Sequence, residues 1–95
     1  MSEAVSGIHP HERSRRDNAR YEAALELIGE ALACYTRLRN RAVTSGDTSE
    51  ADRLWAEQSA CASDQQYLHP DDPAAVEHVL VEYPRLVEWL RNRIG

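Results

Sequence analysis

The chain has 95 residues and a formal net charge of −5, and 42% of its residues are hydrophobic. This length allows one small domain with a single core and excludes a second independent core. The negative charge repels the DNA backbone on average, so nucleic-acid binding would need a local basic patch. No window has the roughly 18 apolar residues of a membrane-spanning helix, and the start lacks the apolar middle of a secretory signal, which predicts a cytoplasmic protein.

The composition favours helices. The chain contains no Phe and one Met, and its many Ala residues are typical of helices that pack closely through small and aliphatic side chains. All 11 basic residues are Arg, which we attribute, with the abundance of Ala, to the coding bias of a GC-rich bacterial genome. Cys34 and Cys61 are too few for a disulfide framework. We expect two buried thiols. A disulfide is the alternative, because a helical hairpin would bring the two residues to similar heights along the helices.

Residues 1–16 show no hydrophobic period, and we expect them to form a flexible N-terminal arm. The arm and the turn after it carry a local excess of positive charge, supplied by Arg13, Arg15, Arg16 and Arg20. These side chains could contact phosphates or an acidic partner, and a solubilising tail is the alternative. His9, His11 and Glu12 lie close together, but three ligands without fixed geometry do not predict a metal site. We therefore expect neither a metal nor another cofactor.

The pattern changes at residue 17, where a regular apolar spacing begins. One face of the predicted first helix, over residues 17–44, carries apolar side chains spaced by four and three, at Tyr21, Leu25, Ile28, Leu32, Tyr35 and Ala42. Ala24, Ala31 and Leu38 widen this stripe, so we expect the helix to contact two other elements and to be central. Ser14 or Asp17 is expected to cap its start, and Gly46 to reverse the chain after its end.

A capping box predicts the start of the second helix. Asp47 is placed to accept from the amide of Glu50, and the Glu50 side chain is expected to reach back to the amide of Asp47. The helix is predicted over residues 48–68. Its expected inner face consists of Ala51, Leu54, Trp55, Gln58, Cys61, Ala62 and Gln65. A gap left in the core by Gln58 and Gln65, together with the histidines, is the only support for a small-molecule or metal carrier.

The third predicted helix begins at Pro73, with Asp72 as its N-cap. Its apolar stripe is the most regular in the chain, at Val76, Leu80, Tyr83, Val87, Leu90 and Ile94, with Val79 and Leu86 beside it. Pro84 lies inside this stripe and would cost about 3 kcal/mol in an ordinary helix interior. Because the stripe keeps its phase across Pro84, we favour one helix bent at this residue over two separate helices.

Trp89 lies about 180° from Leu80 on a straight helix, so it points away from the stripe. The bend at Pro84, or packing against the N-terminal arm, could place Trp89 against other residues of this molecule. It could also be a lone exposed side chain without function. The third interpretation is an exposed aromatic anchor for a protein partner, with Val81, Arg85 and Arg93 beside it, since Trp and Arg are enriched at binding hot spots.

The sequence shows no nucleophile with its base, no carboxylates in contrasting environments and no complete metal or phosphate motif, so we expect no enzymatic activity. We predict an all-α fold, a small three-helix bundle made of a helical hairpin and a C-terminal helix kinked at Pro84. The expected function is a small acidic protein-interaction module, such as a regulator, inhibitor or adaptor, with self-association as a homodimer. The alternative is a nucleic-acid-associated accessory protein that uses the Arg-rich arm.

Overall fold

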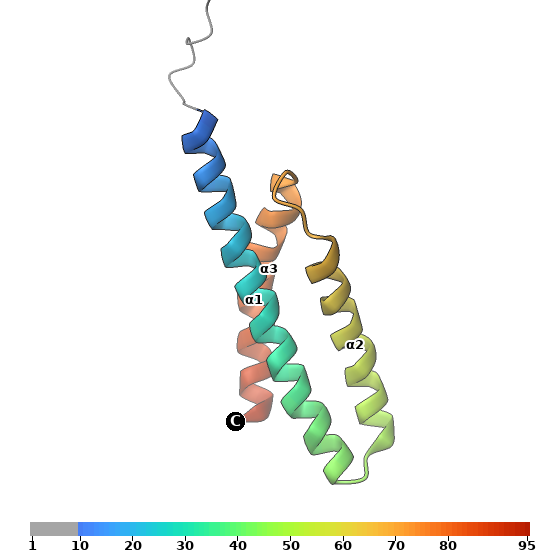
Figure 1. Ribbon diagram of the computed structural model, residues 1–95. Helices are drawn as coiled ribbons and strands as arrows, with labels where there is room; N and C mark the ends of the chain where they lie inside the picture. Colours follow the sequence, from blue (N-terminus) through green and yellow to red (C-terminus); the bar gives the residue numbers. More distant parts are fainter. Residues whose placement is uncertain (1–9) are drawn as a thin grey trace, which may run out of the picture.

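The protein folds as a small all-α three-helix arrangement. The computed structural model describes residues 10–95, and the side chains from residue 15 onward. Over this range the chain forms the helices α1 (Pro10–Thr44), α2 (Thr48–Tyr67) and α3 (Pro73–Ile94), and no strand (Figure 1). The predicted all-helical class is confirmed. Over the residues described, no helix combines the length and the apolar character that crossing a bilayer requires.

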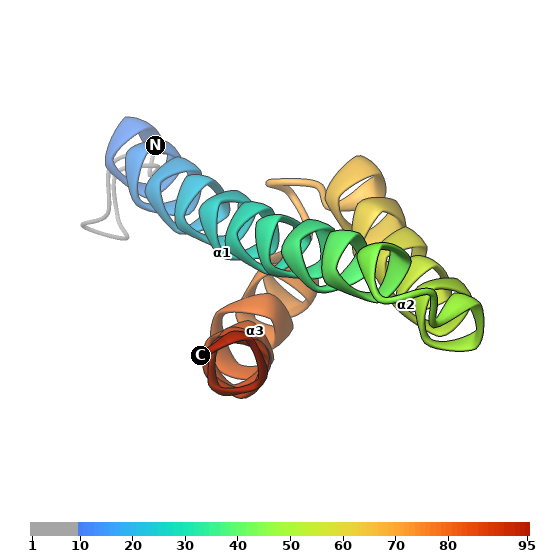
Figure 2. The same ribbon diagram turned by 90° about the horizontal axis from the view of Figure 1, so that it is seen from below.

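Helix α1 is the centre of the fold. It packs against both α2 and α3, whereas no residue of α2 has its Cα atom within 8 Å of a Cα atom of α3. Figure 2 shows α2 and α3 lying on two different sides of α1. The first turns of α1 extend beyond the other two helices (Figure 1), and the molecule measures 68 × 23 × 14 Å. The wide apolar stripe of α1 therefore does contact two elements, as predicted.

Helix α1 begins at Pro10 rather than at residue 17. Residues 10–16 are helical, so the predicted helix start at residue 17 is wrong, and neither Ser14 nor Asp17 stands at the start of the helix. Residues 1–9 of the predicted arm lie outside the described residues. The prediction failed because it required an apolar stripe, whereas a solvated helical turn needs only helix-forming residues such as Arg and Glu.

The core is made mainly by α1 and α3. The buried hydrophobic residues are Ala24, Ile28, Ala31, Cys34, Tyr35, Leu38, Ala42, Leu54, Cys61, Val76, Val79, Tyr83, Val87 and Leu90. Only Leu54 and Cys61 come from α2. Three side chains predicted to face the core from α2 are exposed, namely Trp55, Ala62 and Gln65. Because the backbone of α2 closely approaches that of α1 alone, α2 buries a narrow stripe, and the wide inner face that we predicted does not form. Both thiols are buried and unbonded, as expected.

After the start of α1, the helix ends follow the predicted turn chemistry with one exception. Gly46 has a φ of 78°, the left-handed conformation that favours glycine. The Asp47 carboxylate accepts from the amide of Glu50 at 3.1 Å, but the amide of Asp47 donates to the carbonyl of Ala42 at 2.9 Å. The reciprocal half of the capping box is therefore absent, since its donor is already taken by a backbone carbonyl. This leaves the Glu50 side chain available for other contacts.

Helix α3 runs without a break through Pro84. Asp72 caps its start by accepting from the amide of Ala75 at 3.1 Å, and Pro73 occupies the first turn. In Figure 2 the last turns of α3 are seen almost end-on while its first turns run obliquely, so the helix bends along its length. One continuous helix, rather than two, is confirmed.

Candidate functional site

The four residues predicted as a protein-binding surface lie on one ridge of α3. Val81, Arg85, Trp89 and Arg93 follow one another at intervals of four, which places them along a single i, i+4 row of the helix. Val81 is 43% exposed and Trp89 is 49% exposed. Arg85 is exposed, and Arg93 is partly buried. We call this row the Trp89 ridge.

Trp89 is held in place by a cation from its own helix. The guanidinium carbon of Arg93 lies 4.7 Å from the centroid of the Trp89 ring, within the range of a cation–π interaction. Arg93 in turn donates from Nη2 to Oε2 of Glu50 on α2 at 2.8 Å. Trp89 is therefore neither buried in the core nor isolated on the surface. It is a half-exposed ring whose support is anchored on a second helix.

Glu50 connects the ridge to a chain of polar contacts along α2. Its carboxylate also accepts from Arg53, whose guanidinium donates to Glu57 as well. The remaining oxygen of Glu57 accepts from the hydroxyl of Tyr35 on α1 at 3.1 Å. The hydrogen bond from Arg53, and then the one from Arg93, lower the pKa of Glu50. Glu50 therefore stays ionised at neutral pH and holds Arg93.

Side chains rather than backbones join α2 to α3. The hydroxyl of Tyr83 donates to Oδ2 of Asp64 at 2.7 Å, and the Arg93–Glu50 pair makes the second link nearer the C-terminus. We call the line between these two helices the α2–α3 seam. A cavity of about 210 Å³ lies near its upper end, lined by Asp64, Tyr67, Leu68, Ala75, His78 and Val79.

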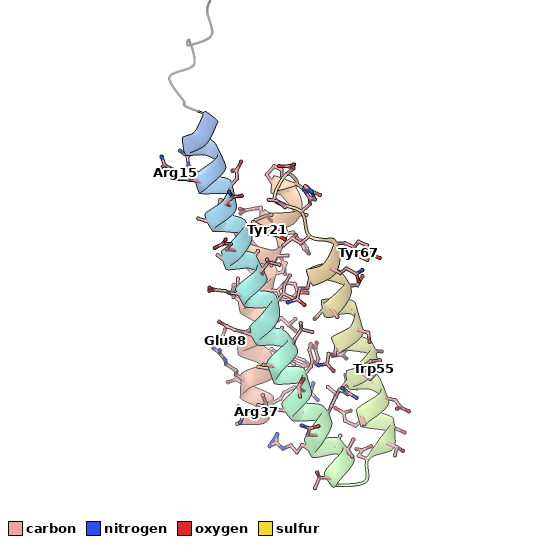
Figure 3. All side chains as sticks on the ribbon, viewed as in Figure 1. Arg15, Tyr21, Arg37, Trp55, Tyr67 and Glu88 are labelled. Carbon is pink, nitrogen blue, oxygen red and sulfur yellow. The ribbon has the colours of Figure 1, made fainter. Side chains whose placement is uncertain are left out.

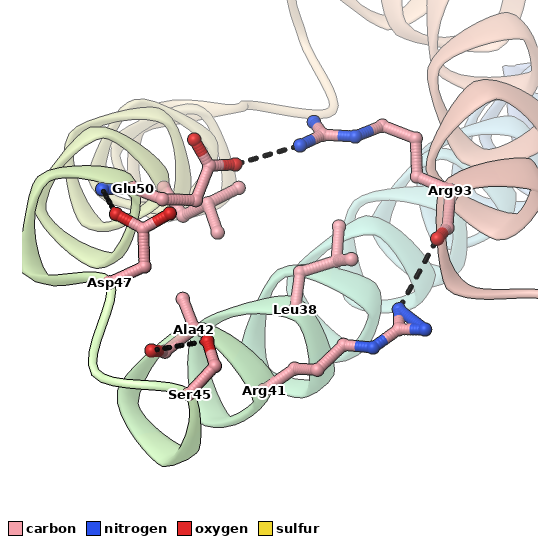
Figure 4. A pocket seen from close by; sticks show the side chains of 8 residues that line it. Leu38, Arg41, Ala42, Ser45, Asp47, Glu50 and Arg93 are labelled. Atoms are coloured by element: carbon pink, nitrogen blue, oxygen red, sulfur yellow. Dashed lines mark hydrogen bonds and ion pairs between the residues drawn. The ribbon is translucent and has the colours of Figure 1, made fainter.

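A second cavity, of about 230 Å³, lies at the lower end of the seam (Figure 4). Its lining residues are Leu38, Arg41, Ala42, Ser45, Asp47, Glu50, Leu54 and Arg93. Arg41 donates to the backbone carbonyls of Arg93 and Ile94, at 3.2 and 2.9 Å, and so attaches the end of α3 to α1. Nη1 of Arg93 is buried without a hydrogen-bond acceptor among the described residues. The Arg93 side chain thus lines this cavity and also stacks on the Trp89 ring of the ridge.

Two tyrosine hydroxyls and one thiol lie between the helices. Burial, followed by the charge of Glu57, raises the pKa of Tyr35 far above its usual value. Burial, followed by the hydrogen bond to Asp64, does the same to the pKa of Tyr83. Burial also raises the pKa of the Cys61 thiol. All three groups are therefore protonated at neutral pH, which suits hydrogen-bond donors that join helices and does not suit a nucleophile or a base.

A second aromatic surface lies on the opposite edge of α2. Trp55 is 56% exposed, and the guanidinium carbon of Arg39 on α1 lies 4.8 Å from its ring centroid. Val43, 64% exposed, lies beside it around an open cavity of about 410 Å³. Figure 3 shows Trp55 on α2, with Tyr67 further along the same helix. We predicted a core position for Trp55, and the 100° step from Leu54 along the helix was the signal that it leaves the buried stripe.

The predicted nucleic-acid residues lie in the first turns of α1. Arg15, Arg16 and Arg20 are exposed, and Arg20 forms an ion pair with Glu77 on α3. The side chain of Arg13 is outside the described part of the chain. Because Arg20 is paired and Asp17 lies between these arginines, the described side chains at the start of α1 form only a small basic patch.

No cluster of three or more potential metal ligands occurs among the described side chains. The histidines near the start, His9 and His11, fall outside that part. The Gln58 amide, which we considered as the border of a core gap, accepts from Arg39 and donates to Thr36 and to the carbonyl of Leu32. No protein-family model, no curated protein and no solved structure matches this chain.

Proposed function

We propose that this chain is a non-enzymatic protein-interaction module that binds another protein through the Trp89 ridge. The observation that carries the proposal is the Arg93-supported, half-exposed Trp89 ring next to Arg85. Tryptophan and arginine dominate binding hot spots because they bury large areas and combine apolar with polar contacts. Small acidic regulators, inhibitors and adaptors are the class of protein that such a surface serves.

The support beneath Trp89 favours binding. An interface side chain that changes from many rotamers to one on binding costs about 0.5–1.5 kcal/mol. The stack on Arg93, and the hydrogen bond of Arg93 to Glu50, restrict the Trp89 ring before a partner arrives. The ridge therefore presents a preorganised aromatic anchor, and Glu50 is a positioning residue for it.

The test compares the two exposed tryptophans. The full chain, Trp89→Ala and the matched control Trp55→Ala are used as baits in extracts of cells that express the protein, and each bound protein is then purified and titrated against all three. We expect a partner whose affinity falls at least about tenfold with Trp89→Ala and less than about twofold with Trp55→Ala. Circular dichroism checks that both variants fold.

Light scattering on the purified chain adds a second readout. A homodimer that Trp89→Ala converts to a folded monomer would support the proposal, with a second copy as the partner. A monomer that binds no protein in a Trp89-dependent manner would refute it. The alternative role, nucleic-acid binding through the Arg-rich segment, predicts affinity for duplex DNA that is lost when Arg13, Arg15 and Arg16 become Ala.

A further inference from the structure

The arrangement of the helices leaves one position of a four-helix bundle unfilled. In such a bundle each helix packs against two neighbours and lies diagonally across from the fourth. Here α1 packs against α2 and α3, while these two keep all their Cα atoms more than 8 Å apart, as diagonal helices do. In Figure 2 they occupy two sides of α1. The empty position therefore lies opposite α1, above the α2–α3 seam.

The two edges that border this position have helical spacing and mixed character. Glu57, Asp64 and Tyr67 follow one another along the α2 edge, and Glu82, Leu86 and Trp89 along the α3 edge. Tyr67 is 75% exposed and Trp89 is 49% exposed, and Leu86 is only partly buried against the core. Apolar side chains therefore alternate with charged ones along both edges, and mixed edges of this kind suit the apolar face and charged flanks of an amphipathic helix.

The charge on these edges is acidic. Arg53 and Arg93 are already paired with Glu50 and Glu57. The Asp64 carboxylate accepts from the Tyr83 hydroxyl, and neither Asp64 nor Glu82 has an ion-pair partner among residues 15–95. One carboxylate without an ion-pair partner thus stands on each edge of the seam, Asp64 on α2 and Glu82 on α3. A partner helix with Lys or Arg on both flanks of its apolar stripe would complement both.

We infer that the α2–α3 seam binds a basic amphipathic helix of a partner protein, which completes a four-helix bundle with Trp89 as its anchor. The inference deepens the proposed function and rests on it. A second copy of this chain fits less well, because its exposed basic segment, residues 15–20, has Ala19 as its single apolar residue and therefore no apolar stripe. The seam is instead complementary to a helix that is both basic and strongly amphipathic.

The experiment uses a synthetic helix as the probe. An amidated peptide of about 18 residues, built from Leu and Lys at helical spacing, is titrated into the full chain carrying Trp55→Phe. Trp89 then supplies all tryptophan fluorescence, because the chain has two Trp residues. We expect a blue shift of the emission and an affinity at least about tenfold higher than that of a Leu/Glu peptide of the same pattern or of a scrambled Leu/Lys peptide.

Charge variants locate the binding site. The double variant Asp64→Asn with Glu82→Gln should weaken binding of the Leu/Lys peptide at least about fivefold, since both attractive carboxylates are lost. The matched control, Glu22→Gln with Glu26→Gln, removes the same charge from exposed positions of α1 and should change the affinity less than about twofold. Asn at position 64 can still accept from Tyr83, so the link between the helices remains.

Several results would overturn the inference: no binding of the Leu/Lys peptide, equal binding of the Leu/Glu peptide, or equal losses in the seam variant and the control variant. A homodimer that buries Trp89 and excludes the peptide would assign the seam to a second copy. The proposed function is tested separately from this inference. A natural partner lost with Trp89→Ala but unaffected by the seam variant would keep the interaction module and discard the basic helix.

Discussion

Leu54 and Trp55 are neighbours in α2, and the structure assigns them opposite contributions to stability. Leu54 is 1% exposed and is one of two buried residues that α2 supplies, whereas Trp55 is 56% exposed. Leu54→Ala removes three buried carbon groups at about 0.8 kcal/mol each. The cavity left behind brings the expected loss of unfolding free energy to about 3–4 kcal/mol. A domain of 95 residues has about 5–14 kcal/mol in total.

The larger residue should matter less. Trp55→Ala removes an exposed stack on Arg39 and partial burial, with an expected loss of at most about 1.5 kcal/mol. Urea unfolding followed by far-UV circular dichroism measures both losses without relying on tryptophan emission. We expect the Leu54→Ala loss to be at least about twice the Trp55→Ala loss, with a fall in Tm of more than about 12 °C for Leu54→Ala. Equal losses, or a larger loss for Trp55→Ala, would refute the assignment of the α2 core face.

Three further predictions concern the turn, the tyrosines and the thiols. Gly46→Ala should destabilise the protein by about 1 kcal/mol, because Gly46 has a φ of 78°. Gly29→Ala in the interior of α1 should stabilise it by about 0.5–1 kcal/mol, because an added Cβ meets nothing within 4 Å. Shifts of the urea midpoint in the same direction for both variants would contradict this. Because the pKa values of Tyr35 and Tyr83 are raised in the folded state, their contribution to stability is complete below the unfolded value of 10.0 and decreases above it. The unfolding free energy should therefore begin to drop near pH 10 and keep falling as the pH rises further, and a variant with both tyrosines changed to Phe should lose most of that drop; an identical drop would show that other groups cause it. Finally, Cys34 and Cys61 are buried, and burial raises the pKa of Cys61, so a thiol reagent should modify them at least about tenfold more slowly in the native protein than in urea; complete native labelling at the unfolded rate would mean that the helices separate readily.

The helix boundaries and the main core stripe were predictable from the sequence, because they depend on local chemistry. Gly46 and Asp47, and then Asp72 and Pro73, determine the backbone geometry of their own turns. The stripe of α3 likewise keeps its period across Pro84, so the continuity of the helix could be inferred. The start of α1 escaped prediction because an exposed helical turn carries no apolar period that marks it.

The four residues of the Trp89 ridge were named from their spacing, since residues four apart share a row on any helix. The sequence alone could not determine what lies beneath Trp89. The support from Arg93 requires Glu50, which lies 43 positions earlier in the chain and reaches Arg93 only after α2 folds back along α1. The same Glu50 was expected to complete a local capping box, and the tertiary contact replaced that local one.

The sequence by itself determined three amphipathic helices, their turns and the residues exposed along α3, because each follows from interactions within a few positions. Only the tertiary structure decided that α2 and α3 each pack along α1 while their own backbones stay apart, because that choice depends on how the side chains of all three helices pack together. This packing exposes Trp55 and leaves the α2–α3 seam open. Contacts between helices, which no local pattern encodes, therefore created the surface that we assign to a partner helix.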